Sequence, residues 1–85
     1  MFHFVYVLQF KNSKDLYKGY TKNLKLRLEQ HRKGLVGSTR NKGPFRLAYF
    51  EGCLNQQDAT HREKYLKKYL GRLFLKNRLK SYLIG

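Results

Sequence analysis

Residues 2–10 constrain the fold most, because they carry a clear pattern of period two. Their sequence is Phe-His-Phe-Val-Tyr-Val-Leu-Gln-Phe, with large side chains on both faces. Alternate side chains of a β-strand point to opposite faces, and a strand that is apolar on both faces is covered on both. The segment therefore predicts a central strand. One face is expected to carry Phe4, Tyr6, Leu8 and Phe10, and the other Val5 and Val7.

A second strand is predicted directly after the first. The polar run of residues 11–15 supplies turn residues, and residues 16–21 return to an extended pattern. Two strands joined by so short a loop form a hairpin. We therefore expect Tyr6 and Tyr17 to lie on neighbouring strands.

A helix and a loop are predicted next. Asn23 suits a helix N-cap, and Leu24, Leu28 and His31 recur at helical spacing. Residues 34–43 are rich in Gly, Ser, Thr, Arg and Lys, which predicts a basic, flexible loop.

The second half of the chain predicts one more strand and two more helices. Residues 45–49 alternate as a third strand would. Asn55, followed by Asp58, resembles a capping box and opens a helix that we expect Gly71 to end. The apolar positions of that helix are Ala59, Leu66 and Leu70, and those of the last helix are Leu75, Leu79, Tyr82 and Leu83.

These elements form one domain of the α+β class. The pattern shows no internal repeat and no linker, so residues 1–85 are expected to build a small three-stranded mixed or antiparallel sheet flanked by helices.

The charge of the chain points to a polyanionic partner. Nineteen Lys and Arg stand against five Asp and Glu, which gives a net charge of +14. No arrangement of internal ion pairs neutralises that excess, so nucleic acid is the expected partner and an inert structural protein is disfavoured. No segment approaches the roughly 20 apolar residues of a membrane span.

The single cysteine and the first residues predict a cytoplasmic protein. Cys53 has no second cysteine with which to form an intrachain disulfide, and the N-terminal segment lacks the pattern of a signal peptide. The three histidines lack the spacing of a zinc site.

One acidic residue stands where a carboxylate is unusual. Glu63 falls between Ala59 and Leu66 on the apolar stripe of the second predicted helix. A covered carboxylate requires a cationic partner, either an arginine or a metal ion. Arg27 and His31, one turn apart on the first helix, can face the same side.

The same residues can also be explained by structural roles alone. Arg27 and Glu63 can form a structural ion pair, His31 can be an edge histidine with no catalytic task, and two tyrosines on adjacent strands can simply stabilise a hairpin. What favours a site is the combination of five residues from the predicted hairpin and two helices: Tyr6, Tyr17, Arg27, His31 and Glu63.

Four segments resemble the GIY-YIG nuclease domain, especially its small bacterial members that are similar to the nuclease module of the excision-repair protein UvrC. Phe4-Val5-Tyr6-Val7-Leu8 resembles the first motif and Leu16-Tyr17-Lys18-Gly19-Tyr20-Thr21 the second. Residues 23–31 and 59–67 resemble the two later helices. The departures are Phe4-Val5 in place of Gly-Ile and Lys18 in place of Ile.

The resemblance implies a metal-dependent endonuclease that hydrolyses phosphodiester bonds of DNA, with a role in DNA repair. Its functional residues carry over to Tyr6, Tyr17, Arg27, His31 and Glu63, and loosely to Asn77. Glu63 would hold one Mg²⁺ or Mn²⁺, Arg27 would clamp the phosphate, and Tyr17 would act on the attacking water with Tyr6 or His31 assisting.

The remaining basic residues are expected to follow the nucleic-acid backbone, so binding would weaken with salt. A partner protein is a possible source of specificity, and a non-catalytic nucleic-acid-binding module is the alternative function. The basic residues concerned are Arg40, Lys42, Lys64, Lys67, Lys68, Arg72, Lys76 and Lys80.

Overall fold

Three strands form one antiparallel sheet in the computed structural model, which describes residues 1–84. The strands are β1 (His3–Phe10), β2 (Leu16–Thr21) and β3 (Phe45–Cys53), in the order β2-β1-β3. β1 is therefore central, as its alternation predicted. Both of its pairings are antiparallel, which decides between the mixed and antiparallel sheets that the sequence left open.

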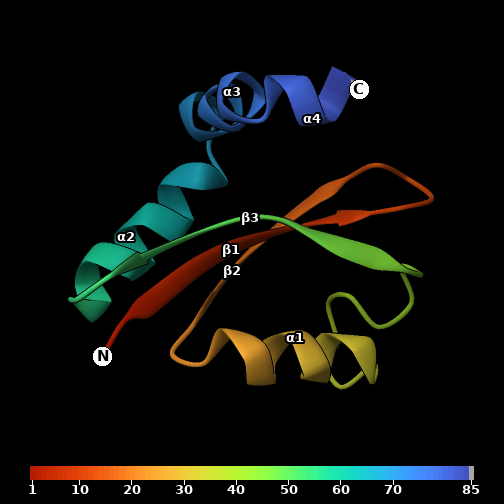
Figure 1. The fold of residues 1–85 in the computed structure, drawn as a ribbon, viewed down its shortest axis with the longest axis horizontal. Coiled ribbons are helices and arrows are strands. Elements are labelled where there is room, and N and C mark those ends of the chain that lie inside the picture. The colour runs from red at the N-terminus through yellow and green to blue at the C-terminus, as the bar shows by residue number, and fades with distance from the viewer. Residues whose placement is uncertain (85) are drawn as a thin grey trace.

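Within residues 1–84, four helices flank the sheet. They are α1 (Leu24–Arg32), α2 (Gln56–Leu66), α3 (Tyr69–Arg78) and the short α4 (Lys80–Ile84). Figure 1 shows α1 on one side of the sheet and α3 and α4 on the other. The α+β class is confirmed.

The two faces of β1 supply two separate cores. Val5 and Val7 pack with Ala59 and Leu66 of α2 and with Leu75 of α3. On the opposite face, the buried side chains of Tyr6 and Leu8 pack against Leu28 of α1. The predicted division of β1 into two faces is confirmed.

Two asparagines cap the starts of α1 and α2, as predicted. The Asn23 side chain accepts a hydrogen bond of 3.1 Å from the backbone N–H of Leu26. The Asn55 side chain accepts from Gln57 and Asp58 at 2.8 and 3.1 Å. Each cap satisfies N–H groups that the first turn of a helix leaves without a partner.

The predicted end of the second helix is wrong. The helix ends at Leu66, and a new helix begins at Tyr69, so Gly71 lies buried inside α3. This glycine serves close packing, because a Cβ at position 71 would lie closer than 3.0 Å to backbone atoms of Tyr65 and Leu66. Leu70, assigned to the apolar stripe from the sequence, is instead 62% exposed.

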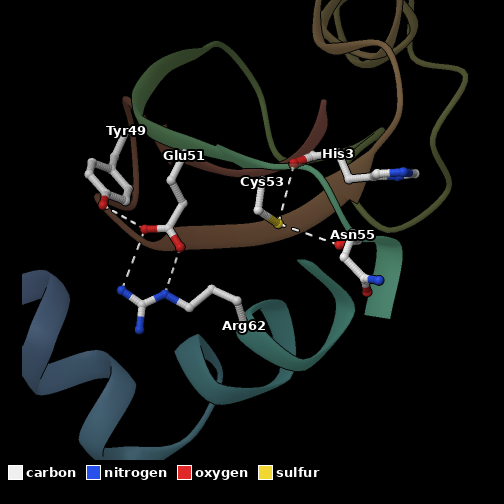
Figure 2. A network of polar contacts seen from close by, with 6 residues as sticks. All are labelled: His3, Tyr49, Glu51, Cys53, Asn55 and Arg62. Atoms are coloured by element: carbon white, nitrogen blue, oxygen red, sulfur yellow. Dashed lines mark hydrogen bonds and ion pairs between the residues drawn. The ribbon is translucent and has the colours of Figure 1, made fainter. Parts of the chain in front are cut away.

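A polar network ties the last strand to the helices behind it (Figure 2). Arg62 donates from Nε to Glu51 at 2.6 Å, and the Tyr49 hydroxyl donates to the same carboxylate at 2.7 Å. The Arg62 guanidinium also lies over the ring of Phe74, 4.4 Å from its centre. These contacts join β3, α2 and α3 and so fix the orientation of α2.

No helix within residues 1–84 combines the length and the apolar character that a membrane crossing requires.

Candidate active site

Tyr6 is the buried centre of the candidate site. Its side chain is 0% exposed, and its hydroxyl lies 2.7 Å from Nε2 of His31. Gly19 pairs with Tyr6 across β1 and β2, and a Cβ on Gly19 would lie closer than 3.0 Å to the phenol ring and its oxygen. The glycine in β2 therefore leaves the space in which the Tyr6 phenol lies.

His31 connects the sheet to α1 and to the loop that follows. It is buried on α1, and its second ring nitrogen, Nδ1, lies 2.8 Å from the hydroxyl of Thr39. Burial lowers the pKa of His31, and the nearby Arg27 charge lowers it further. The imidazole is therefore held in its neutral form more firmly than in an exposed histidine.

Tyr17 is the more accessible of the two tyrosines. It is half-buried, its ring centre lies 5.4 Å from that of His31, and its hydroxyl accepts a hydrogen bond of 3.2 Å from Ser38. Tyr17 pairs with Leu8 in the sheet, so Tyr6 and Tyr17 are diagonal neighbours with ring centres 6.4 Å apart.

Arg27 lies one turn before His31. Its Nη1 donates to Gln30 at 3.1 Å, whereas Nε is buried and has no hydrogen-bond partner among residues 1–84. Burial raises the pKa of the Tyr6 hydroxyl, and the Arg27 guanidinium opposes that rise. Arg27 therefore lies close enough to act electrostatically on the tyrosine.

Glu63 is largely covered, and the predicted need for a cation is met by a lysine. Its side chain is 19% exposed and lies 3.1 Å from the Lys67 ammonium one turn along. Within the described residues no ion pair joins Glu63 to Arg27, so the structural pair considered from the sequence is not formed. The Glu63 charge contributes to the raised pKa of Tyr6, which sets it near the same site.

The donor set around Glu63 fits one hard divalent cation. Residues 1–84 contain no cluster of three His, Cys, Asp or Glu side chains, so Glu63 would be the single charged ligand. Mg²⁺ accepts one carboxylate, because it keeps several waters and takes phosphate oxygens as further ligands. The Lys67 side chain is 54% exposed and is free to move away from the carboxylate.

Comparison with known proteins identifies the family. The family model described as the GIY-YIG catalytic domain matches residues 2–80. The chain belongs to the GIY-YIG family. This is a nuclease family whose members generally depend on a divalent metal.

Bacterial relatives of this GIY-YIG chain carry names that state no activity. A UPF0213 protein of Clostridium perfringens is 42% identical over 67 residues, covering 78% of this chain and 71% of the relative. A UPF0213 protein of Oceanobacillus iheyensis is 37% identical over 67 residues, covering 78% and 77%. The solution NMR structure of a UPF0213 protein from Bacillus halodurans is 32% identical, with a TM-score of 0.50 and coverage of 99% and 83%.

The predicted basic residues lie on the surface of the GIY-YIG domain, in the loop after α1 and along the segment from α2 to α4. All eight expected to follow the nucleic-acid backbone are exposed: Arg40, Lys42, Lys64, Lys67, Lys68, Arg72, Lys76 and Lys80. Asn77 is also exposed, and no hydrogen bond of the described residues joins it to the site.

Two residues of the site escaped the sequence analysis. Ser38 and Thr39 bond Tyr17 and His31, and they belong to the loop that was predicted to be flexible. That loop is in fact anchored, with Val36 and Thr39 buried. Lys18, the departure in the second motif, lies on the opposite face of β2 from Tyr17, since it pairs with Val7. It is half-buried, and its pKa is lowered by burial and by the charges of Arg72 and Lys67.

The neutral His31 predicts a stability that increases with pH. Its pKa is lowered in the folded protein, so the unfolded chain binds the proton more readily. The stabilisation is complete above the unfolded value of about 6.5 and is lost as the pH falls toward the folded value, by at most about 1.4 kcal/mol per pH unit. Urea unfolding between pH 4 and 8 measures this slope. His31→Gln should flatten it, whereas His61→Gln, at an exposed histidine, should not; equal slopes in both variants would contradict the assignment.

Proposed function

We propose that residues 1–85 form a single GIY-YIG endonuclease domain that hydrolyses phosphodiester bonds of DNA with one Mg²⁺ or Mn²⁺ ion. The observation that carries this proposal is the unpartnered, buried Nε of Arg27 beside the hydrogen-bonded pair of Tyr6 and His31. A cation with an unused donor next to titratable groups is the arrangement expected for binding a reacting anion.

Arg27 clamps the phosphate in this proposal. Its planar guanidinium suits two phosphate oxygens, and Nε is a donor that forms no hydrogen bond within residues 1–84. A bound phosphate oxygen would satisfy that donor. Arg27 then stabilises the negative charge that grows on the phosphate as water attacks.

Tyr17 orients the attacking water. It is half-buried, whereas Tyr6 is fully buried, so Tyr17 is the phenol that substrate and water meet first. His31, adjacent to both rings, offers a neutral imidazole as the proton acceptor. Because Nε2 is already bonded to Tyr6, the Tyr6 hydroxyl would give its own proton to Nε2 and take the proton of the water held by Tyr17.

Glu63 holds the metal ion. A bound divalent cation supplies charge stabilisation at the phosphate oxygens. Before metal binds, Lys67 covers the carboxylate, and its exposed ammonium is free to turn toward a phosphate of the substrate.

The exposed lysines and arginines track the nucleic-acid backbone, which makes binding dependent on salt. We propose DNA as the substrate, a cytoplasmic location, a role in DNA repair, and a partner protein as the source of specificity. A non-catalytic nucleic-acid-binding module is the second candidate function. The basic surface is the observation that favours it, because charge is enough for binding and requires no catalysis.

Cleavage of labelled single-stranded, duplex and branched DNA, with and without Mg²⁺ or Mn²⁺, tests the proposal. We expect metal-dependent nicking that falls about 100-fold in Tyr17→Phe, the loss typical when a reacting group is misplaced. Tyr69→Phe, at an exposed tyrosine on α3, should cleave at the normal rate. Tight, salt-dependent binding without cleavage in any metal would instead support the binding module.

A further inference from the structure

The loop between α1 and β3 contributes a hydroxyl to the centre of the site. Thr39 is only 5% exposed, although its neighbours Ser38 and Arg40 are exposed. A threonine in a basic surface loop is normally solvated. Joining α1 to β3 does not require a buried threonine, so the burial of Thr39 against His31 needs another explanation.

The contacts of Thr39 are consistent with one hydrogen-bond direction. Its hydroxyl lies 3.4 Å from the backbone carbonyl of Val36 and 2.8 Å from Nδ1 of His31. A carbonyl only accepts hydrogen bonds, so a hydroxyl proton directed at Val36 leaves the Thr39 oxygen to accept. In this arrangement Nδ1 of His31 is the donor.

The direction of the Thr39–His31 bond sets the direction of the His31–Tyr6 bond. In a neutral imidazole one ring nitrogen carries the proton and the other accepts. With the proton on Nδ1, the Nε2 nitrogen accepts from the Tyr6 hydroxyl at 2.7 Å. The bonds run in one sense from Tyr6 through His31 and Thr39 to the carbonyl of Val36.

We propose that Thr39 is a positioning residue that holds His31 as the Nδ1–H tautomer, so that Nε2 is free to accept the proton of Tyr6. The catalytic consequence rests on the proposed nuclease function, whereas the tautomer itself does not. Without the threonine oxygen, the form with the proton on Nε2 becomes populated. In that form Nε2 is a donor and cannot receive a proton from Tyr6.

The loop is built to deliver this hydroxyl. The N–H of Thr39 donates to the carbonyl of Val36 at 3.1 Å, and the buried Val36 side chain holds the turn against the protein. The N–H of Leu35 donates to Gln30 of α1 at 2.9 Å, which joins the start of the loop to the helix that carries His31. The helix that carries His31 and the hydroxyl of Thr39 are therefore held together by local contacts.

Two measurements on Thr39→Val, Thr39→Ser and Thr60→Val test the proposal. Long-range ¹H–¹⁵N spectra of the imidazoles report which nitrogen of His31 carries the proton, with His3 and His61 as references in the same spectrum. Cleavage of labelled DNA with Mg²⁺ reports the catalytic consequence. Among the described residues the Thr60 hydroxyl bonds only its own helix, through the carbonyl of Gln57, and its variant is the control.

We expect the Nδ1–H tautomer in the unchanged protein, in Thr39→Ser and in Thr60→Val, and its loss in Thr39→Val. The cleavage rate should fall about 10-fold to 100-fold in Thr39→Val, as for other residues that orient a functional histidine, and Thr39→Ser should recover most of it.

An Nε2–H tautomer in the unchanged protein, or an unaltered tautomer in Thr39→Val, would overturn the proposal. If the tautomer changes as expected but no form of the protein cleaves DNA, the positioning role stands and the nuclease function fails.

Discussion

Replacing Glu63 by glutamine is expected to lower the metal-dependent cleavage rate about 1000-fold. A metal ion that stabilises the reacting phosphate contributes several kcal/mol to the transition state, and about 4 kcal/mol corresponds to that factor. Glutamine keeps the size of the side chain but removes the charge that holds the cation. The shape of α2 should not change, because Glu63 already lies on its largely covered side.

A measurement of DNA binding separates the fall in cleavage rate from a loss of affinity. The substitution makes the protein more positive by one charge, so binding without metal should be unchanged or slightly tighter, whereas the rate falls. Glu29→Gln is the matched control, because Glu29 is exposed and pairs with Arg32 at 3.0 Å on the surface of α1. Equal cleavage by the two variants would mean that Glu63 serves only as the partner of Lys67.

Replacing Gly71 by alanine should cost the protein about 3 kcal/mol of stability or more. The new Cβ would lie closer than 3.0 Å to the carbonyl of Tyr65 and to the Cα of Leu66, which are backbone atoms that cannot turn away. Overpacking of this kind typically costs 1–3 kcal/mol, and here the connection between α2 and α3 must move as well. For a domain of this size the expected fall in melting temperature is about 12–24 °C.

Gly37→Ala is the control for that experiment. A Cβ at position 37 meets nothing within 4 Å, and the backbone there has no positive φ. Alanine should therefore be neutral or stabilise by about 0.4–1 kcal/mol through the unfolded state. Thermal unfolding of both variants measures the difference. A Gly71→Ala protein with the same melting temperature as Gly37→Ala would contradict the proposed close packing.

The same glycine shows where sequence patterns stop being informative. A glycine at the end of an apolar stripe predicts a helix end, because that is the commonest local reason for it. Gly71 is required by a contact between two helices, and the residues it approaches gave no sign of that contact. The wrong helix boundary near Leu66 followed directly from this.

The sequence by itself determined the three strands and the starts of two helices, and it predicted the kind of partner. The alternation in β1 gave a central strand with two covered faces, Asn23 and Asn55 predicted the helix starts, and the net charge of +14 predicted a polyanion. These are local or additive properties, which depend on neighbouring residues or on a sum over the chain.

Only the tertiary structure decided how the candidate site is connected. That His31 lies between Tyr6 and Thr39, that Lys67 covers Glu63, and that Gly19 makes room for the Tyr6 phenol are contacts between distant or differently folded segments. Their cause is packing of helices and a loop onto one sheet, and the direction of a hydrogen bond follows from which groups meet there. No spacing along the chain encodes that meeting.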